Sequence, residues 1–249
     1  MKFKKSYVIC ATPRTGSTLL CNILRGTDLA GRPNEYFTPS EEPRFREKFG
    51  VSGADGFKEY LDRVIDEATG RNGVVGFKIM MGQFYEFVER LRGIAATEYQ
   101  TLNEYELLNH FFPDLRYIWM TRRNKVRQAV SFSRAVQTRH WVHPDGRKQA
   151  QKEPQYRFSG IDLLMQRVAI FEAKWQEYFS RYEIKPLIVS YEDLVNSRQE
   201  TVMEILRFIG VKPREDLDLS ESLKKQADQL NEIWVERFIR EKAAAIMDH

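Results

Sequence analysis

Four short apolar runs, set far apart along the chain, constrain the fold more than any other feature. They cover residues 7–11, 73–79, 117–120 and 186–190 and are rich in β-branched and aromatic residues. Runs of this length and composition are typical of strands that are buried on both faces. The segments between them are long enough for helical crossovers, which parallel strands require. The sequence therefore predicts an α/β fold in which a central parallel sheet is flanked by helices.

Two helices can be predicted from spacing and end signals. In the first, apolar residues recur three and four positions apart, which places them on one stripe of a helix. These residues are Leu164, Val168, Phe171, Trp175, Tyr178 and Tyr182. The second helix is predicted to begin with a capping box formed by Ser197 and Glu200 and to end at Gly210.

Two charged stretches are harder to place. Residues 41–73 contain several glycines and one amphipathic piece at 57–64, which favours an excursion over the sheet rather than a separate domain. From Glu221 onward the tail is charged and helical in pattern, with apolar members such as Trp234 and Phe238. Docking on the domain and docking on a second subunit both fit this tail. We predict one domain over residues 1–249.

The charge balance limits the partners of the chain. Its 249 residues include 39 Lys and Arg against 35 Asp and Glu, a net charge of +4. This excess is too small and too evenly mixed for a dedicated nucleic-acid binder. A small anionic ligand is the better expectation.

Cysteines and targeting signals bear on where the protein works. Cys10 and Cys21 have no spaced partners for a metal site or a disulfide framework, so we expect reduced core thiols. The apolar run 7–11 is too short for a signal-peptide core and is cut by Pro13. No stretch of about twenty apolar residues could span a bilayer. We therefore expect a cytoplasmic protein without a membrane span.

A loop of small residues follows the first predicted strand and leads into a helix start. Its sequence is Thr12-Pro13-Arg14-Thr15-Gly16-Ser17-Thr18. Gly16 permits close backbone approach, the hydroxyls can donate hydrogen bonds, and a helix N-terminus attracts anions. The loop lacks the first glycine and the lysine of a Walker A motif, which disfavours ATP hydrolysis. An ordinary capped turn has similar residues, so the loop alone leaves both interpretations open.

A second candidate anion site follows the third predicted strand. Arg123 stands at the strand's end, and Ser131 comes eight positions later, about two helical turns on. A guanidinium offers a planar fork to phosphate oxygens, and a serine hydroxyl can complete the shell. The alternative is a solvated basic helix, because Arg122, Lys125 and Arg127 surround the two candidates. Two anion motifs at the carboxyl ends of strands, where α/β sheets bind ligands, favour the phosphate site.

The motifs resemble those of a known family. The segment Pro13 to Leu20 resembles the 5'-phosphosulfate loop of sulfotransferases that use 3'-phosphoadenosine 5'-phosphosulfate (PAPS). Cytosolic sulfotransferases carry lysine in this loop; Arg14, together with Gly31-x-Pro33-x-Glu35-Tyr36-Phe37, is similar to the bacterial trehalose 2-sulfotransferase family. The spacing from Arg123 to Ser131 resembles the 3'-phosphate motif, and the segment after the fourth strand resembles one whose tyrosine, here Tyr191, lies near the adenine.

This resemblance implies a P-loop-like sulfotransferase fold and an enzyme that moves a sulfuryl group by in-line displacement from PAPS to a carbohydrate hydroxyl. The implied acceptor is the 2-hydroxyl of trehalose or of a related sugar, and the implied product is 3'-phosphoadenosine 5'-phosphate. No permanently bound cofactor is implied. A homodimer is the implied assembly.

The resemblance also assigns roles to residues. Glu35 is implied as the general base, and Arg14 as the group that stabilises the departing phosphate. Met80 stands where the cytosolic branch has its histidine base, and Lys78 fits either the sulfuryl oxygens or a buried ion pair. The implied nucleotide-binding residues are Arg14, Thr15, Gly16, Ser17, Thr18, Arg123, Ser131 and Tyr191. The implied acceptor-binding residues are Pro33, Asn34, Glu35, Tyr36 and Phe37, and the last two would offer flat ring faces to a sugar.

Three other interpretations are less favoured. His140 and His143 have a spacing that suits a metal, but no Cys/His/Asp cluster accompanies them, so we expect no metal. A P-loop kinase for a small metabolite would lack its Gly-Lys-Ser/Thr segment and a persuasive magnesium site. A non-catalytic nucleotide-binding protein would have no need of Glu35 and Arg14.

Overall fold

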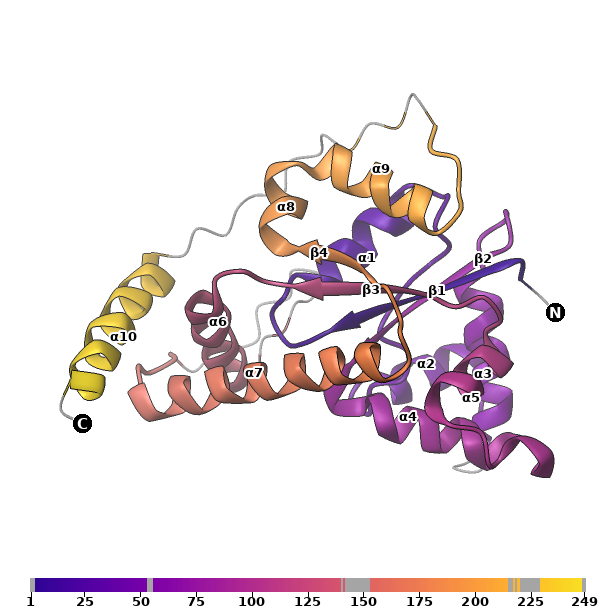
Figure 1. Ribbon diagram of the computed structural model, residues 1–249, viewed down its shortest axis with the longest axis horizontal. Coiled ribbons are helices and arrows are strands. Elements are labelled where there is room, and N and C mark those ends of the chain that lie inside the picture. Colours follow the sequence, from indigo (N-terminus) through magenta and orange to yellow (C-terminus); the bar gives the residue numbers. More distant parts are fainter. Residues whose placement is uncertain are drawn as a thin grey trace.

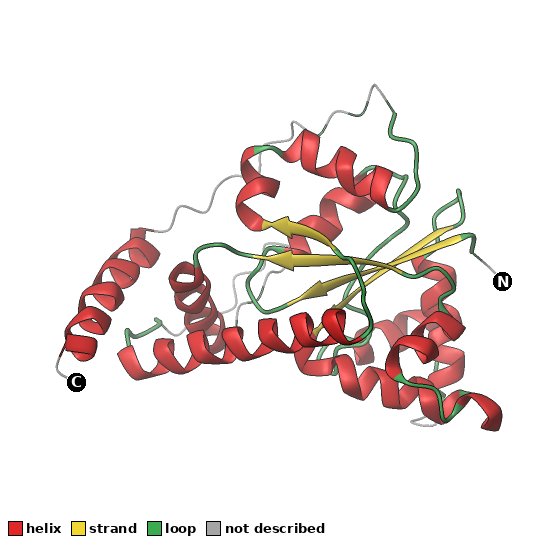
Figure 2. Cartoon of the chain, viewed as in Figure 1, coloured by secondary structure: helices red, strands yellow, loops and turns green. Residues whose placement is uncertain are grey.

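A four-stranded parallel sheet lies at the centre of the structure (Figures 1 and 2). The computed structural model describes residues 3–52, 56–139, 141, 153–214, 217, 219 and 229–247. The strands are β1 (Lys5–Ala11), β2 (Val74–Met80), β3 (Arg116–Thr121) and β4 (Leu187–Ser190), in the order β2-β1-β3-β4. Neighbouring strands are all parallel. The four predicted strands and the α/β class are therefore confirmed.

Helices connect the strands and cover both faces of the sheet (Figure 1). They are α1 (Ser17–Gly26), α2 (Glu42–Phe49), α3 (Phe57–Ala68), α4 (Met81–Ile94), the 3-10 turn η1 (Thr97–Tyr99), α5 (Glu104–Phe111), α6 (Lys125–Thr138), α7 (Phe158–Arg181), α8 (Tyr191–Asn196), α9 (Arg198–Phe208) and α10 (Gln229–Met247). The stripe from Leu164 to Tyr182 belongs to α7 and its C-terminal cap. Between residues 41 and 73, where the sequence indicates one amphipathic piece, the structure has two helices, α2 and α3.

Strand β1 shows how the core divides into two layers. Val8 and Cys10 belong to one buried cluster, whereas Tyr7 and Ile9 belong to the other, because successive side chains of a strand point to opposite faces. Helices α1, α8 and α9 cover the Tyr7 face. Helices α4, α5 and α7, with α2 and α3, cover the Val8 face.

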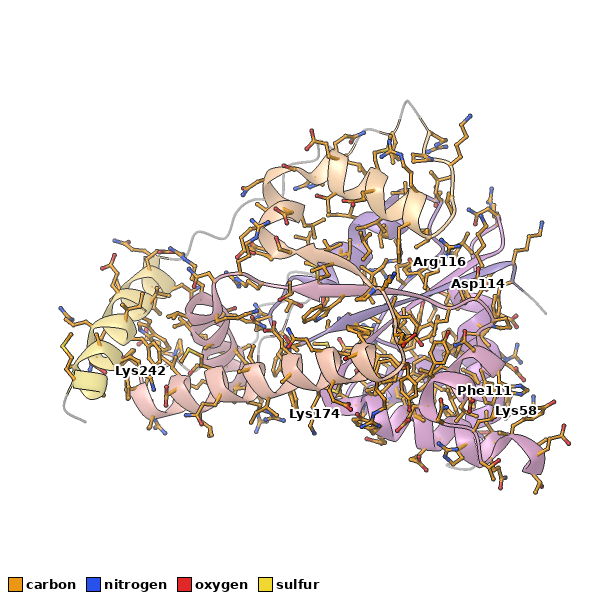
Figure 3. All side chains as sticks on the ribbon, in the orientation of Figure 1. Lys58, Phe111, Asp114, Arg116, Lys174 and Lys242 are labelled. Carbon is orange, nitrogen blue, oxygen red and sulfur yellow. The ribbon has the colours of Figure 1, made fainter. Side chains whose placement is uncertain are left out.

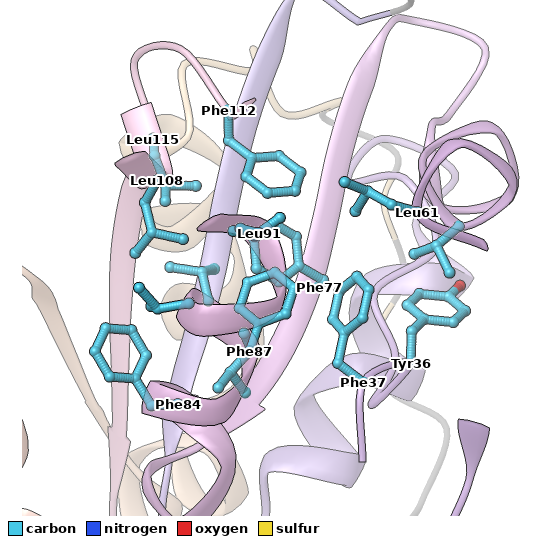
Figure 4. Close-up of a cluster of buried hydrophobic side chains, with 14 of the residues drawn as sticks. Tyr36, Phe37, Leu61, Phe77, Phe84, Phe87, Leu91, Leu108, Phe112 and Leu115 are labelled. Atoms are coloured by element: carbon cyan, nitrogen blue, oxygen red, sulfur yellow. The ribbon is translucent and has the colours of Figure 1, made fainter. Parts of the chain in front are cut away.

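Aromatic rings fill much of the core on the Val8 face (Figure 4). The ring centroids of Phe37 and Phe87 lie 4.3 Å apart, and those of Phe77 and Phe112 lie 4.6 Å apart. Burying a phenylalanine side chain contributes about 1.5 to 3 kcal/mol relative to leaving it exposed. This cluster therefore holds the loop that carries Phe37 against β2.

The C-terminal helix α10 docks on the domain. Trp234 and Phe238 are buried against Ala129 on α6 and Ile161 on α7. Ion pairs reinforce the contact, among them Lys242 with Asp162 at 2.8 Å between Nζ and Oδ1 (Figure 3 labels Lys242). Of the two alternatives for the tail, docking on the domain is the one this structure contains.

The predicted capping box at Ser197 is wrong, although the helix is present. Ser197 precedes α9 but makes no side-chain capping hydrogen bond. Its ψ of 48° departs from the extended value usual for a capping serine, because the residue also terminates α8, donating its backbone N–H to the Asp193 carbonyl at 2.8 Å. A side-chain cap occurs at Ser190 instead, where Oγ accepts from the Asp193 N–H at 3.0 Å.

The strand order places a topological switch point at the carboxyl end of β1. β2 lies on one side of β1 and β3 on the other, so the connections that leave β1 and β3 diverge at their carboxyl ends. Trp175 on α7 fixes the end of β1 by donating its indole N–H to the Ala11 carbonyl at 3.1 Å. The two predicted anion motifs therefore meet at this switch point, where Arg14 contacts Ser131.

The described helices and the two cysteines bear on the expectations for membrane spans and disulfides. Within the described residues, no helix has the length and apolar character needed to cross a membrane. Cys10 and Cys21 are both buried free thiols, as the sequence predicts.

Candidate active site

The loop after β1 closes against Tyr191. Gly16 caps α1 in the left-handed conformation, with φ of 84°. A Cβ atom added at Gly16 would lie 2.6 Å from the Tyr191 ring, so both the backbone conformation and the close approach require glycine. The first amide groups of α1 have no partners within the helix. The left-handed Gly16 and the start of α1 thus have the backbone geometry that an anion cradle requires, and the binding of an anion there stays a prediction.

The hydroxyls of the loop have different roles. Thr15 is fully buried and donates its hydroxyl hydrogen to the Thr12 carbonyl at 3.0 Å, which shapes the loop itself. Ser17 is buried at the first position of α1. Thr18 accepts a hydrogen bond from Lys78 Nζ at 3.1 Å. Only part of the predicted hydroxyl set is therefore free to face a ligand.

Arg14 joins the two anion motifs. Its Nε donates to Ser131 Oγ at 2.9 Å, and its Nη1 donates to the Trp141 carbonyl at 2.6 Å. Burial, and then the nearby guanidiniums of Arg122 and Arg134, lower the pKa of Arg14 from its usual value. Positive charges crowded in this way favour an anion between them.

Gln128 on α6 is a positioning residue that sequence reasoning missed. It is fully buried, and its Nε2 donates to Thr12 Oγ1 at 3.0 Å and to the Pro13 carbonyl at 2.8 Å. It stands three positions before Ser131, so the two share a helix face. That spacing is the signal from which it could have been found.

Arg123 contacts α8. Its side chain is 63% exposed, and Nη2 lies 2.5 Å from Asp193 Oδ1. Its backbone N–H donates to Glu192 Oε2 at 2.9 Å. The structure therefore pairs Arg123 with α8 rather than with the serine that the motif predicts as its companion.

Arg122, the residue before Arg123, points toward Tyr191 and the loop after β1. Its guanidinium lies 4.7 Å from the Tyr191 ring centroid, and its Nη1 donates to the Arg14 carbonyl at 3.4 Å. Its Nε is buried and has no hydrogen-bond partner among the described residues, and burial lowers its pKa. The sequence patterns assign Arg122 no role of its own and name it only in the alternative of a solvated basic helix. Extending the alternation of β3 from Ile118 and Met120 would have placed it on the inward face.

Glu35 and Lys78 form a buried ion pair next to the loop. Lys78 Nζ lies 2.5 Å from Glu35 Oε2, with side-chain exposures of 3% and 20%. The Thr38 hydroxyl donates to Glu35 Oε1 at 2.7 Å. Of the two roles that fit Lys78, the ion pair is the one seen here. Because Lys78 also bonds Thr18, it connects the implied base to the anion cradle.

The segment that carries Glu35 is pinned to β2 and α3. Gly31 has φ of 66°, and a Cβ atom there would lie 2.4 Å from the Val74 carbonyl. Arg32 donates its backbone N–H to the Ala68 carbonyl at 2.8 Å, and Lys78 donates its own to the Asn34 carbonyl at 2.9 Å. These contacts fix Glu35 in register with Lys78.

Tyr36 and Phe37 do not offer open ring faces. Tyr36 is 2% exposed and donates its hydroxyl hydrogen to the Arg32 carbonyl at 2.7 Å, and Phe37 is 5% exposed in the aromatic core. Pro33 is buried as well, whereas Asn34 is half-buried. The predicted sugar-stacking role of the two rings is therefore wrong in this conformation, because packing against α2, α3 and α4 takes up their faces.

The structure describes only part of the histidine segment. His140 and His143 lie outside the described residues. Among the residues that are described, no group of three or more His, Cys, Asp or Glu side chains is placed to hold a metal ion.

Comparisons with known proteins point in one direction. The family model described as Stf0 sulphotransferase matches residues 6–241. The chain is 32% identical to a trehalose 2-sulfotransferase of Mycolicibacterium smegmatis, with 95% of each chain covered. It is 31% identical to a trehalose 2-sulfotransferase of Mycobacterium tuberculosis, with 94% of each covered.

Two solved structures share the fold at low sequence identity. The sulfotransferase domain of the curacin biosynthetic pathway matches with a TM-score of 0.51 and 16% identity, over 86% of this chain and 77% of that one. Sulfotransferase STF9 from Mycobacterium avium matches with a TM-score of 0.50 and 11% identity, over 97% of this chain and 69% of that one. The α/β architecture is thus that of sulfotransferases.

Proposed function

The chain belongs to the Stf0 sulphotransferase family and is a sulfotransferase, and we propose that it moves the sulfuryl group of PAPS to the 2-hydroxyl of trehalose or of a related sugar. The names of the two curated relatives support trehalose as the acceptor. We further propose that residues 1–249 act as one catalytic domain.

Contacts at the end of β1 support PAPS as the donor. The N-terminus of α1 and the Arg14 guanidinium would hold the 5'-phosphosulfate. Ser131, with Arg122 or Arg123, would hold the 3'-phosphate. Tyr191 would lie against the adenine. Arginine and helix amides suit these groups because both bind phosphate oxygens strongly.

The observation that carries the proposal is the chain of contacts from Glu35 through Lys78 to Thr18. Glu35 Oε2 lies 2.5 Å from Lys78 Nζ, which in turn donates to Thr18 Oγ1 at 3.1 Å. A proton acceptor, a buried cation and the donor loop are therefore neighbours. In-line transfer needs these three groups in one place.

The proposed reaction forms one bond to sulfur and breaks another. The sugar hydroxyl oxygen attacks the sulfur while its proton passes to a Glu35 carboxylate oxygen. The bond between sulfur and the bridging phosphate oxygen breaks, and its electron pair stays on the 5'-phosphate. Arg14 would stabilise the charge that grows there, and Lys78 the oxygens of the moving group.

Sulfate transfer from labelled PAPS tests the proposal. We expect transfer to trehalose but not to an analogue with 2-deoxy groups in both rings. ATP with magnesium in place of PAPS should yield no phosphorylated sugar, which separates the sulfotransferase from a kinase. Thermal stabilisation by 3'-phosphoadenosine 5'-phosphate without transfer to any of a panel of sugars would instead support a non-catalytic nucleotide-binding protein.

We also propose a homodimer, on the family resemblance alone. Light scattering coupled to gel filtration measures the mass directly. A mass near 29.4 kDa, that of one chain, at all practical concentrations would contradict this part of the proposal.

A further inference from the structure

A cationic cleft lies beside the segment that carries Glu35. It has a volume of about 470 Å³ and is bordered by the C-terminal end of α1, by residues 32–36, by α2 and by the end of α3. Arg25, Arg32, Arg44 and Lys48 line it, and among the described residues Glu67 is the one carboxylate that does. The volume falls within the range of small-molecule sites, roughly 300 to 1,000 Å³.

The positive charges of this cleft are only partly neutralised. Glu67 serves two of them, with Oε1 at 2.7 Å from Lys48 Nζ and Oε2 at 3.9 Å from Arg32 Nη1. Arg44 is paired outside the lining set, with Glu41 at 3.3 Å. Arg25 hydrogen-bonds the neutral amide oxygen of Asn22, and no carboxylate in the described part of the chain is paired with it. The cleft therefore has an excess of positive charge that an anion would balance.

The cleft lies on the opposite side of the segment from the catalytic pair. Arg32, Asn34 and Tyr36 line it, whereas Glu35 does not. Glu35 points instead to Lys78, whose Nζ lies 2.5 Å from Glu35 Oε2. An anion in the cleft would therefore bind away from the reacting sugar hydroxyl.

Asn34 connects the cleft to the catalytic pair through two hydrogen bonds. Its side-chain Oδ1 accepts the Glu35 N–H at 2.9 Å. Its carbonyl accepts the Lys78 N–H at 2.9 Å. A ligand that holds Asn34 in place would also hold the backbone of both partners.

We propose that this cleft is a binding site for a sulfate or phosphate monoester of a small polyhydroxy compound. Guanidinium forks match the oxygens of either ester, and the Glu67 carboxylate can accept hydrogen bonds from hydroxyls. The sulfated sugar that the proposed function would produce belongs to this class. The site itself does not depend on that function, because it is defined by the cleft's own charges.

Calorimetry with defined probes tests the site. Glucose 6-sulfate and glucose 6-phosphate are titrated into the protein in the presence of saturating 3'-phosphoadenosine 5'-phosphate, with glucose as the neutral control. We expect both esters to bind, glucose not to bind, and added NaCl to weaken the binding because the cations are exposed. The ester that binds with higher affinity indicates whether the natural ligand is a sulfated product or a phosphorylated metabolite. Equal binding of glucose, or no binding of either ester, would overturn the proposal.

Variants locate the binding. Arg25→Gln and Lys48→Gln should each weaken ester binding about ten-fold, since each removes one charged hydrogen-bond donor. Arg207→Gln on α9 and Lys174→Gln on α7 remove exposed charges elsewhere and should have no effect on ester binding; Figure 3 labels Lys174. Arg14→Ala should also leave ester binding unchanged. Loss of binding in Arg14→Ala but not in Arg25→Gln would place the probes at the proposed donor site beside Arg14 and overturn the proposal.

Hydrogen exchange provides a second readout. Ester binding should slow exchange in peptides that cover residues 31–37 and 74–80, because Asn34 holds backbone amides in both. Arg25→Gln should keep native sulfate transfer when no ester is added, because Arg25 contributes nothing to the proposed donor or acceptor contacts. If the unsubstituted protein transfers sulfate but binds no ester, the ester site is refuted and the proposed enzyme function stands. If it binds the esters but transfers no sulfate, the proposed enzyme function is refuted and the ester site stands.

Discussion

Replacing Glu35 with Gln removes one charge of a buried ion pair and keeps the shape of the side chain. Lys78 is 3% exposed, and its ammonium lies 2.5 Å from the Glu35 carboxylate. After the substitution the amide oxygen can still accept a hydrogen bond from Lys78, as Thr18 Oγ1 does at 3.1 Å, but Lys78 loses the carboxylate with which it is paired in the described part of the chain. The variant therefore tests two statements at once: that Glu35 accepts the proton, and that it neutralises Lys78.

The structure sets the expected magnitudes. Breaking a buried ion pair by removing one partner costs about 3 to 5 kcal/mol. We take the lower end, about 3 kcal/mol, because Glu35 is 20% exposed and water screens part of the interaction. In a chain of this size that loss lowers Tm by about 6 to 12 °C. Loss of a general base lowers turnover by about two to four decades.

A second substitution separates the two effects. Lys78→Met in the Glu35→Gln background removes the unpaired charge, so the double variant should regain most of the lost Tm. It should remain inactive in the PAPS transfer assay, because the proton acceptor is still missing. Binding of 3'-phosphoadenosine 5'-phosphate by Glu35→Gln should stay nearly native.

Two outcomes would refute this reasoning. Near-native turnover of Glu35→Gln on a verified acceptor would show that another group takes the proton. An unchanged Tm would show that Lys78 does not need Glu35 as its counter-charge.

Four further substitutions or reagents probe the rest of the site. Arg14→Ala should lower turnover more than nucleotide affinity, because the charge it faces grows as the phosphate departs; equal proportional losses in kinetics and calorimetry would make it a plain binding residue. Arg123→Ala should weaken 3'-phosphoadenosine 5'-phosphate by about one to two decades relative to the nucleotide without the 3'-phosphate, whereas equal losses would mean that it only anchors α8 through Asp193. Gly16→Ala should destabilise the protein by about 1 to 3 kcal/mol and weaken nucleotide binding, since φ is 84° there; native thermal and binding curves would contradict the tight loop. Burial raises the pKa of Cys21 to about 11, so at pH 8 iodoacetamide should label it, as read by mass spectrometry, far more slowly in the folded than in the urea-unfolded chain, and equal rates would exclude a buried thiol.

The strands could be predicted because parallel strands buried on both faces are uniformly apolar. Residues 7–11 contain no charged side chain, and the alternation of Tyr7 and Val8 between two core clusters follows from the strand alone. Helix α2 escaped prediction because only Glu42 and Phe45 are buried along its eight residues. Glu42 is held by Arg46, four positions later, at 2.7 Å and by Arg90 on α4 at 2.6 Å. The contact with Arg90 joins residues far apart in the sequence, so no local pattern indicates it.

The candidate site was predictable in its loops and less so in its side chains. Backbone features such as Gly16 and the start of α1 follow from local sequence. The orientation of Arg122 against Arg123 depends on which face of β3 meets Tyr191. The burial of Phe37 depends on rings from α3 and α4 that are distant in the sequence. Both are decided by tertiary packing, which single-sequence patterns do not contain.

Helix α10 stabilises the proposed donor site indirectly, through α6. It packs on the face of α6 that contains Ala129, while another part of α6 holds Gln128 and Ser131 against the loop after β1. Helix α10 therefore supports α6, and α6 in turn positions the loop after β1. A shortened chain that lacks α10 would expose the surface of α6 and α7 on which Trp234 packs. Because α6 also holds the loop after β1, this truncation should loosen that loop as well.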